Sequence, residues 1–159
     1  MAFLVWLHES GLAKWVAGSQ SLWAYPTILT AHTVGMAILA GLSSVIALRI
    51  LGMWRQLPLA PMERLFPLIW LGFWISALSG SALFIADAVA KAENPAFWGM
   101  MLFVALGMVN MSLLRNRMFH HPGLDAESLP TNAKILAGTS LAFWTGAITA
   151  GRMIAYLQG

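Results

Sequence analysis

The chain alternates between long apolar runs and short segments that hold most of its polar residues. Four runs stand out, at about 21–48, 64–90, 95–114 and 134–157. A helix of about 20 residues crosses roughly 30 Å of hydrocarbon, and each run reaches that length. The pattern predicts an all-α, integral membrane four-helix bundle that forms a single membrane domain over residues 1–159.

Residues 1–18 show a different pattern. Phe3 and Leu7 alternate there with polar residues that include His8 and Lys14, and the segment is too short to span. We expect an N-terminal amphipathic helix that lies in the membrane interface.

Local signals support the span boundaries. Trp23 and Tyr25 are aromatic residues of the type found at membrane interfaces, and Pro26 follows in the first helical turn, where a missing N–H costs little. Asn94 and Pro95 form a good helix start, because Asn caps free N–H groups and Pro suits the first helical position.

The basic residues predict the topology. With four spans, both termini lie on one side, and the two connections on the other side hold six of the nine Lys and Arg residues. These six are Arg49, Arg55, Arg64, Arg115, Arg117 and Lys134. By the positive-inside rule, we expect the two long connections in the cytoplasm and the termini outside.

The composition narrows the class of protein to which the chain can belong. The chain is 59% hydrophobic and 9% charged, against about 25% charged residues in soluble domains. The net charge is +3, but the basic residues stand singly at the ends of apolar runs, which argues against a nucleic-acid partner. The chain has no cysteine, which excludes disulfides, iron–sulfur clusters and covalently attached c-type haem.

Each predicted span has one face of small and polar residues, as expected for helices that pack together in lipid. His32 shares its face with Gly35 and Ser43. The polar residues expected in the interior are Ser76, Asp87, Asn110 and Thr145. Packing alone explains most such residues, and the number of Gly and Ala ridges favours a homo-oligomer or a subunit of a membrane complex.

His32, Asp87 and Arg152 are expected at similar depth in the outer third of the bundle. In the purely structural interpretation, Asp87 pairs with Arg152, or Arg152 extends to the lipid headgroups, while neutral His32 bonds to a backbone carbonyl. In the functional interpretation, His32 is an axial ligand of haem b in an electron-transfer protein, and Arg152 neutralises a propionate.

The second haem ligand stays open. His8, a second copy of His32, or the thioether of Met100 are the candidates. Two other functions remain as alternatives: a solute or metal carrier in which His32 binds a soft metal ion, and a non-catalytic accessory subunit. The sequence does not decide whether the protein is an enzyme.

Several short motifs recur in order along nearly the whole chain, and together they resemble a known pattern. They are Trp15-Val16, Trp23 with Pro26, His32 to Gly35, Leu48 to Gly52, Ser79-Gly80 with Leu83-Phe84, Asn94 to Phe97, Asn110, and Gly151 to Tyr156. With them the chain resembles an uncharacterised family of small four-span bacterial inner-membrane proteins, a domain of unknown function. The resemblance implies the four-span fold and a bacterial inner membrane, and it draws attention to His32, Asn110 and Arg152. It implies no activity, and the family often has Lys where this chain has Met100.

Overall fold

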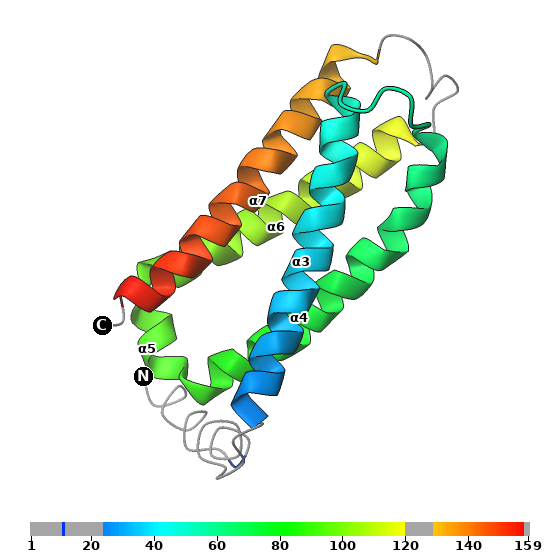
Figure 1. Ribbon diagram of the computed structural model, residues 1–159. Coiled ribbons are helices and arrows are strands. Elements are labelled where there is room, and N and C mark those ends of the chain that lie inside the picture. The colour runs from blue at the N-terminus through cyan, green and yellow to red at the C-terminus, as the bar shows by residue number, and fades with distance from the viewer. Residues whose placement is uncertain (1–10, 12–23, 120–128, 158–159) are drawn as a thin grey trace.

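The computed structural model describes residues 11, 24–119 and 129–157, and every regular element among them is helical. The elements are α3 (Ala24–Ile50), the 3-10 helix η1 (Ala60–Leu65), α4 (Phe66–Ala86), α5 (Ala88–Glu93), α6 (Pro95–Met118) and α7 (Thr131–Leu157). Four of these helices are long and lie side by side (Figure 1). The predicted interfacial helix over 1–18 lies outside the described residues, Gly11 excepted.

Three of the described segments are long and apolar enough to cross a membrane by length and composition: Tyr25–Ile50, Ala60–Ala86 and Pro95–Met118. They correspond to the first three predicted spans. Helix α7 is as long as α3, at 27 residues, but it is richer in threonine and is not among the three. The fourth span therefore stays a prediction.

The long helices pack in the order α4, α3, α7, α6. Helix α3 packs along α4 on one side and against α7 on the other, and α7 packs along α6. Helices α4 and α6 are not closely packed along their length. The structure is therefore two tight helix pairs, α3–α4 and α6–α7, joined mainly by α3 and α7.

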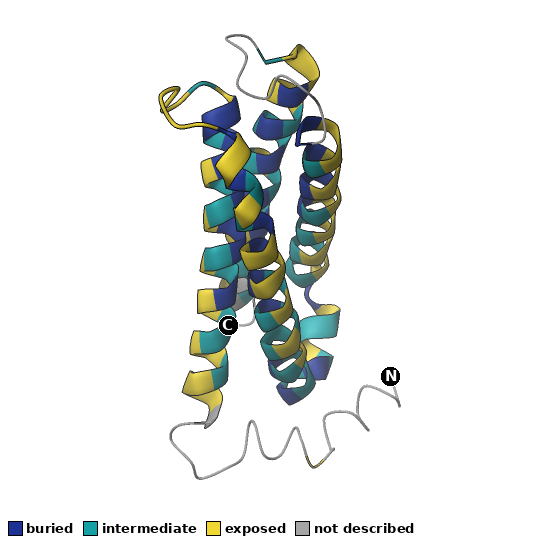
Figure 2. Ribbon diagram, turned by 90° about the vertical axis from the view of Figure 1, so that its right-hand side faces the viewer, coloured by how far each residue is buried: buried dark blue, intermediate teal, exposed yellow. Residues whose placement is uncertain are grey.

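The buried residues lie mainly on the helix sides that face one another (Figure 2). They gather toward the end of the molecule where α3 ends and α4 begins, which we call the basic end because the six basic residues of the predicted cytoplasmic connections lie there. Core members at this end include Ile46, Ile50, Phe66, Ile69, Leu114 and Ala137. The opposite end contains α5 and the first turns of α3 and α6.

Arg49 shapes the connection after α3. Its guanidinium is buried and donates from Nε to the carbonyl of Leu57 and from Nη2 to that of Arg55, the latter at 3.0 Å. Gly52 takes a φ of 106°, in the left-handed region that favours glycine, where this connection turns. A residue that marks topology in the sequence thus also closes a loop.

The predicted second span, 64–90, is not one helix. It ends at Ala86, because Asp87 has φ −145° and ψ 53° and breaks the helix before α5. Because of the break, the Asp87 N–H donates to Phe84 O instead of Leu83 O, and Lys91 Nζ donates to Leu83 O at 2.6 Å. A lysine side chain thus replaces the lost backbone donor, as basic residues often do at helix C-termini.

Candidate functional site

The backbones of α3 and α4 approach closely at a seam formed by Gly35, Gly72 and Ser76. A Cβ atom added to Gly35 would lie 2.6 Å from Ser76 Oγ and 2.9 Å from Gly72 O. A Cβ added to Gly72 would lie 2.9 Å from Gly35 O. Only glycine allows this approach, so both positions require it for steric reasons.

His32 lies one turn from this contact and faces α4. Its Nδ1 lies 3.0 Å from Ser76 O and 3.4 Å from Ser79 Oγ, and a Cβ on Gly80 would lie 3.0 Å from the ring. A carbonyl oxygen can only accept, so Nδ1 carries the proton when the imidazole is neutral. Nε2 then has the free lone pair, and no described residue donates a hydrogen bond to it.

This arrangement gives His32 the form of a ligand histidine. Metal-binding histidines usually donate their second ring N–H to a carbonyl or carboxylate, which fixes the tautomer and the ring orientation. The ring is half-buried in the single chain. Among the described residues, no three His, Cys, Asp or Glu side chains gather into a metal site, so His32 offers a single nitrogen.

The other predicted ligands are not brought to His32. Met100 packs in the α6–α7 pair, where its sulfur lies 3.3 Å from the position of a Cβ on Gly151. His8 lies outside the described residues. The structure therefore places His32 and Met100 in different helix pairs.

Asp87 and Arg152 do not form the predicted ion pair. Asp87 Oδ2 lies 3.9 Å from Lys91 Nζ, one turn along the chain. Arg152 is exposed, and no described residue forms an ion pair with it. The expected cluster of His32, Asp87 and Arg152 is thus not formed, because His32 bonds to α4 and Asp87 pairs with Lys91.

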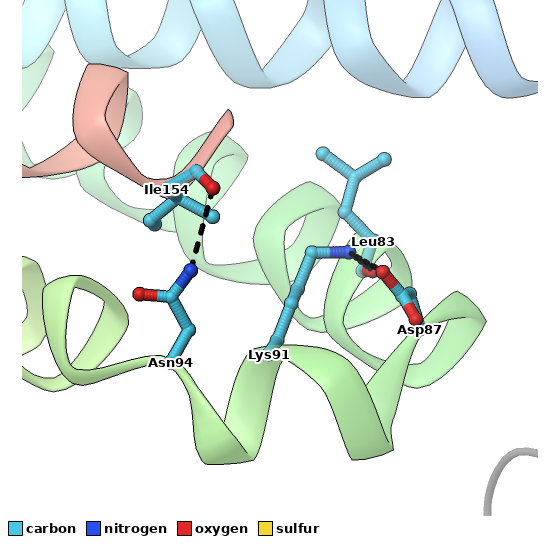
Figure 3. Close-up of polar contacts among 5 residues, drawn as sticks. All are labelled: Leu83, Asp87, Lys91, Asn94 and Ile154. Carbon is cyan, nitrogen blue, oxygen red and sulfur yellow. Dashed lines mark hydrogen bonds and ion pairs between the residues drawn. The ribbon is translucent and has the colours of Figure 1, made fainter. Parts of the chain in front are cut away.

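The polar contacts around α5 were not predicted from the sequence (Figure 3). Besides the contacts of Lys91, Asn94 donates from Nδ2 to Ile154 O at 3.3 Å and accepts from the N–H of Ala96 at 2.9 Å. The predicted capping by Asn94 is therefore confirmed, while its bond to α7 was not predicted. Burial lowers the pKa of Lys91 from 10.5, and Asp87 raises it in part.

The remaining predictions of polar residues in the interior are confirmed in part. Asn110 is buried and donates to Leu136 O at 2.8 Å, and Ser76 is buried in the α3–α4 seam. Thr145, in contrast, is exposed. The buried side of α7 instead holds Ala133, Ala137, Ser140, Trp144 and Ala147. Gly107 of α6 explains the difference, because a Cβ there would lie 3.1 Å from the Trp144 ring, so glycine makes room for the large side chain.

The fold and the half-buried histidine define a class: an all-helical chain with three helices able to span a membrane and one imidazole held in a helix seam. No protein-family model matches the chain, and no curated protein or solved structure matches it significantly. The function must therefore be argued from the site.

Proposed function

We propose that this protein binds haem b through Nε2 of His32 and acts as a one-electron carrier in a membrane. One observation carries the proposal: Nδ1 is engaged by Ser76 O at 3.0 Å, so the neutral ring presents an unprotonated Nε2. The proposal includes a fourth span formed by α7, a bacterial inner membrane and periplasmic termini, as the basic residues and the resemblance suggest.

The second axial ligand would come from outside the described helices. Gly35 and Gly72 are in backbone contact, so a macrocycle cannot enter between α3 and α4 at their level. His8 or His32 of a second copy could supply an imidazole on the open side of the ring. Met100 is the less suitable partner because its sulfur is packed on Gly151.

Arg152 is the proposed partner of a haem propionate. Its side chain is exposed and makes no ion pair with the described residues, so its charge is available. A cation beside a propionate reduces the cost of placing that charge near hydrocarbon.

A second candidate function is that of a non-catalytic accessory subunit. It is favoured by the contact between the His32 ring and Gly80, because that contact and the bond to Ser76 O would also serve packing alone. In this case His32 holds α3 against α4 and binds no ligand.

The test is a reduced-minus-oxidised absorption spectrum of detergent-purified protein from haem-replete cells, with the haem extracted and quantified. We expect a low-spin signal at about one haem per chain or per two chains, the lower ratio pointing to a shared site. His32→Ala should abolish the signal while the protein stays helical. Thr33→Ala is the matched control, because Thr33 is exposed and its one hydrogen bond among the described residues is to Leu29 O in its own helix.

A colourless parent protein, or an unchanged spectrum in His32→Ala, would remove the haem proposal. A colourless protein that loses thermal stability on His32→Ala would instead support the accessory-subunit candidate.

A further inference from the structure

The gap between α4 and α6 contains a cavity of about 170 Å³ near the basic end. Its walls include Phe66, Ile69 and Trp70 of α4, and Met108, Arg115 and Asn116 of α6. Trp70 and Asn116 are exposed, so the cavity opens outward from the bundle. It is far larger than the roughly 10–15 Å³ that one water requires.

Arg115 brings a cation with unused hydrogen-bond donors into this cavity. Its Nε is buried and has no hydrogen-bond partner among the described residues. Among the described residues, its ion-pair partner is Glu63, whose Oε1 lies 3.8 Å from Nη2, beyond hydrogen-bond distance. The guanidinium lies over the Phe66 ring, with Cζ 5.5 Å from the centroid, which fixes its position without using its donors.

The cavity lies at the end of a candidate span. Arg115 stands three residues before Met118, where α6 ends, and Glu63 belongs to η1, just before α4. Above this level and toward the cavity side, α4 exposes Trp74, one turn from Trp70, and α6 exposes Met101, two turns from Met108. A charged cavity therefore continues into an apolar surface of the kind that acyl chains cover.

We propose that this groove binds an anionic phospholipid, with the headgroup phosphate on Arg115 and Asn116 and an acyl chain along Trp70 and Met108. A planar guanidinium with free donors suits phosphate oxygens, and basic pockets between membrane helices are typical sites for anionic headgroups. The apolar wall distinguishes a lipid from a free anion, which would gain nothing from it.

The experiment is native mass spectrometry of delipidated, detergent-solubilised protein after addition of equimolar phosphatidylglycerol and phosphatidylcholine. The parent should retain phosphatidylglycerol over phosphatidylcholine by about fivefold, the effect of one cation near a membrane surface. Arg115→Gln should remove this preference. Arg117→Gln is the matched control: Arg117 is an exposed cation two residues away that does not line the cavity, and the preference should persist.

Two further variants separate charge from shape. Met108→Trp should reduce retention of both lipids while Arg115 remains, because it fills the apolar wall. Glu63→Gln should raise the preference for phosphatidylglycerol, because it removes the competing carboxylate, and it tests the site even if Arg115→Gln fails to fold.

The proposal is overturned if Arg115→Gln and Arg117→Gln reduce the preference equally, or if Glu63→Gln lowers it. Displacement of the phospholipid by millimolar inorganic phosphate would also overturn it, in favour of a free-anion site.

Discussion

The two helix pairs are built on the same principle but leave their polar residues in different states. In each pair, a polar side chain on one helix bonds to a backbone carbonyl of the other: His32 to Ser76 O in α3–α4, and Asn110 to Leu136 O in α6–α7. In each pair, glycine permits the close packing. Such bonds are a common way to join helices in lipid.

The two pairs differ in the hydrogen-bonding groups that their polar side chains leave unused. Asn110 is 5% exposed, and its Oδ1 accepts from Thr139 Oγ1 at 3.3 Å, so both ends of its amide are bonded to α7. His32 is half-buried, and among the described residues only its Nδ1 has hydrogen-bond partners. A polar group with both ends satisfied is explained by packing, whereas His32 retains an acceptor that packing does not require.

The pairs also differ in the groups that lie opposite their glycines. Gly35 and Gly72 face each other's backbone, whereas Gly107 and Gly146 face the rings of Trp144 and Phe103. A ring can shift by a few tenths of an ångström, but a helix backbone moves only as a whole. The α3–α4 seam should therefore tolerate added atoms least.

The largest effect is expected from Gly35→Ala. The new Cβ would meet Ser76 Oγ at 2.6 Å and Ser76 N at 2.8 Å, which forces the helices apart. We expect a loss of about 2 kcal/mol in unfolding free energy, measured by denaturant titration in detergent. Gly41→Ala is the control: nothing lies within 4 Å of its added Cβ, and better helix propensity should make it neutral or slightly stabilising. Equal effects of the two changes would contradict the backbone-contact interpretation.

A smaller loss is expected from Asn110→Leu in the other pair. It removes the bonds to Leu136 O and Thr139 Oγ1, and interhelical bonds of this kind contribute about 1 kcal/mol in membranes. The measurement is the same titration. Ser112→Ala should change little, since Ser112 is exposed and, within the part of the chain that the structure describes, bonds to Met108 O of its own helix alone. If Asn110→Leu is as harmless as Ser112→Ala, the amide does not join the pair.

The smallest effect concerns Lys91, at the corner between the pairs. Its pKa is lowered in the folded state by burial, so between that value and 10.5 the unfolded chain binds more protons. Unfolding free energy should therefore rise with pH across this window, and Lys91→Met should flatten the rise. Lys134→Met, which changes an exposed lysine on α7, should leave the slope of the parent. A slope that survives Lys91→Met would assign it to another group.

The sequence by itself determined the helices and the class, because both follow from local properties. Apolar runs of spanning length specify helices in lipid regardless of their neighbours. The pair Asn94 and Pro95 predicted the start of α6 at the residue where it begins. The helix break at Asp87 was not predicted, and Lys91 supports it by donating to Leu83 O, a contact that the pattern of apolar residues does not reveal.

Only the tertiary structure decided which faces meet. Membrane-spanning helices are apolar on all sides, so the spacing of hydrophobic residues does not mark the face that turns inward. Small and polar residues are the remaining signal for that face, and this signal is ambiguous. This signal correctly predicted that His32 and Asn110 face another helix. It was wrong for Thr145, which is exposed because Trp144 fits the space left by Gly107. Helix partners are chosen by such complementarity between distant segments, and this is why His32 faces α4 while Met100 faces α7.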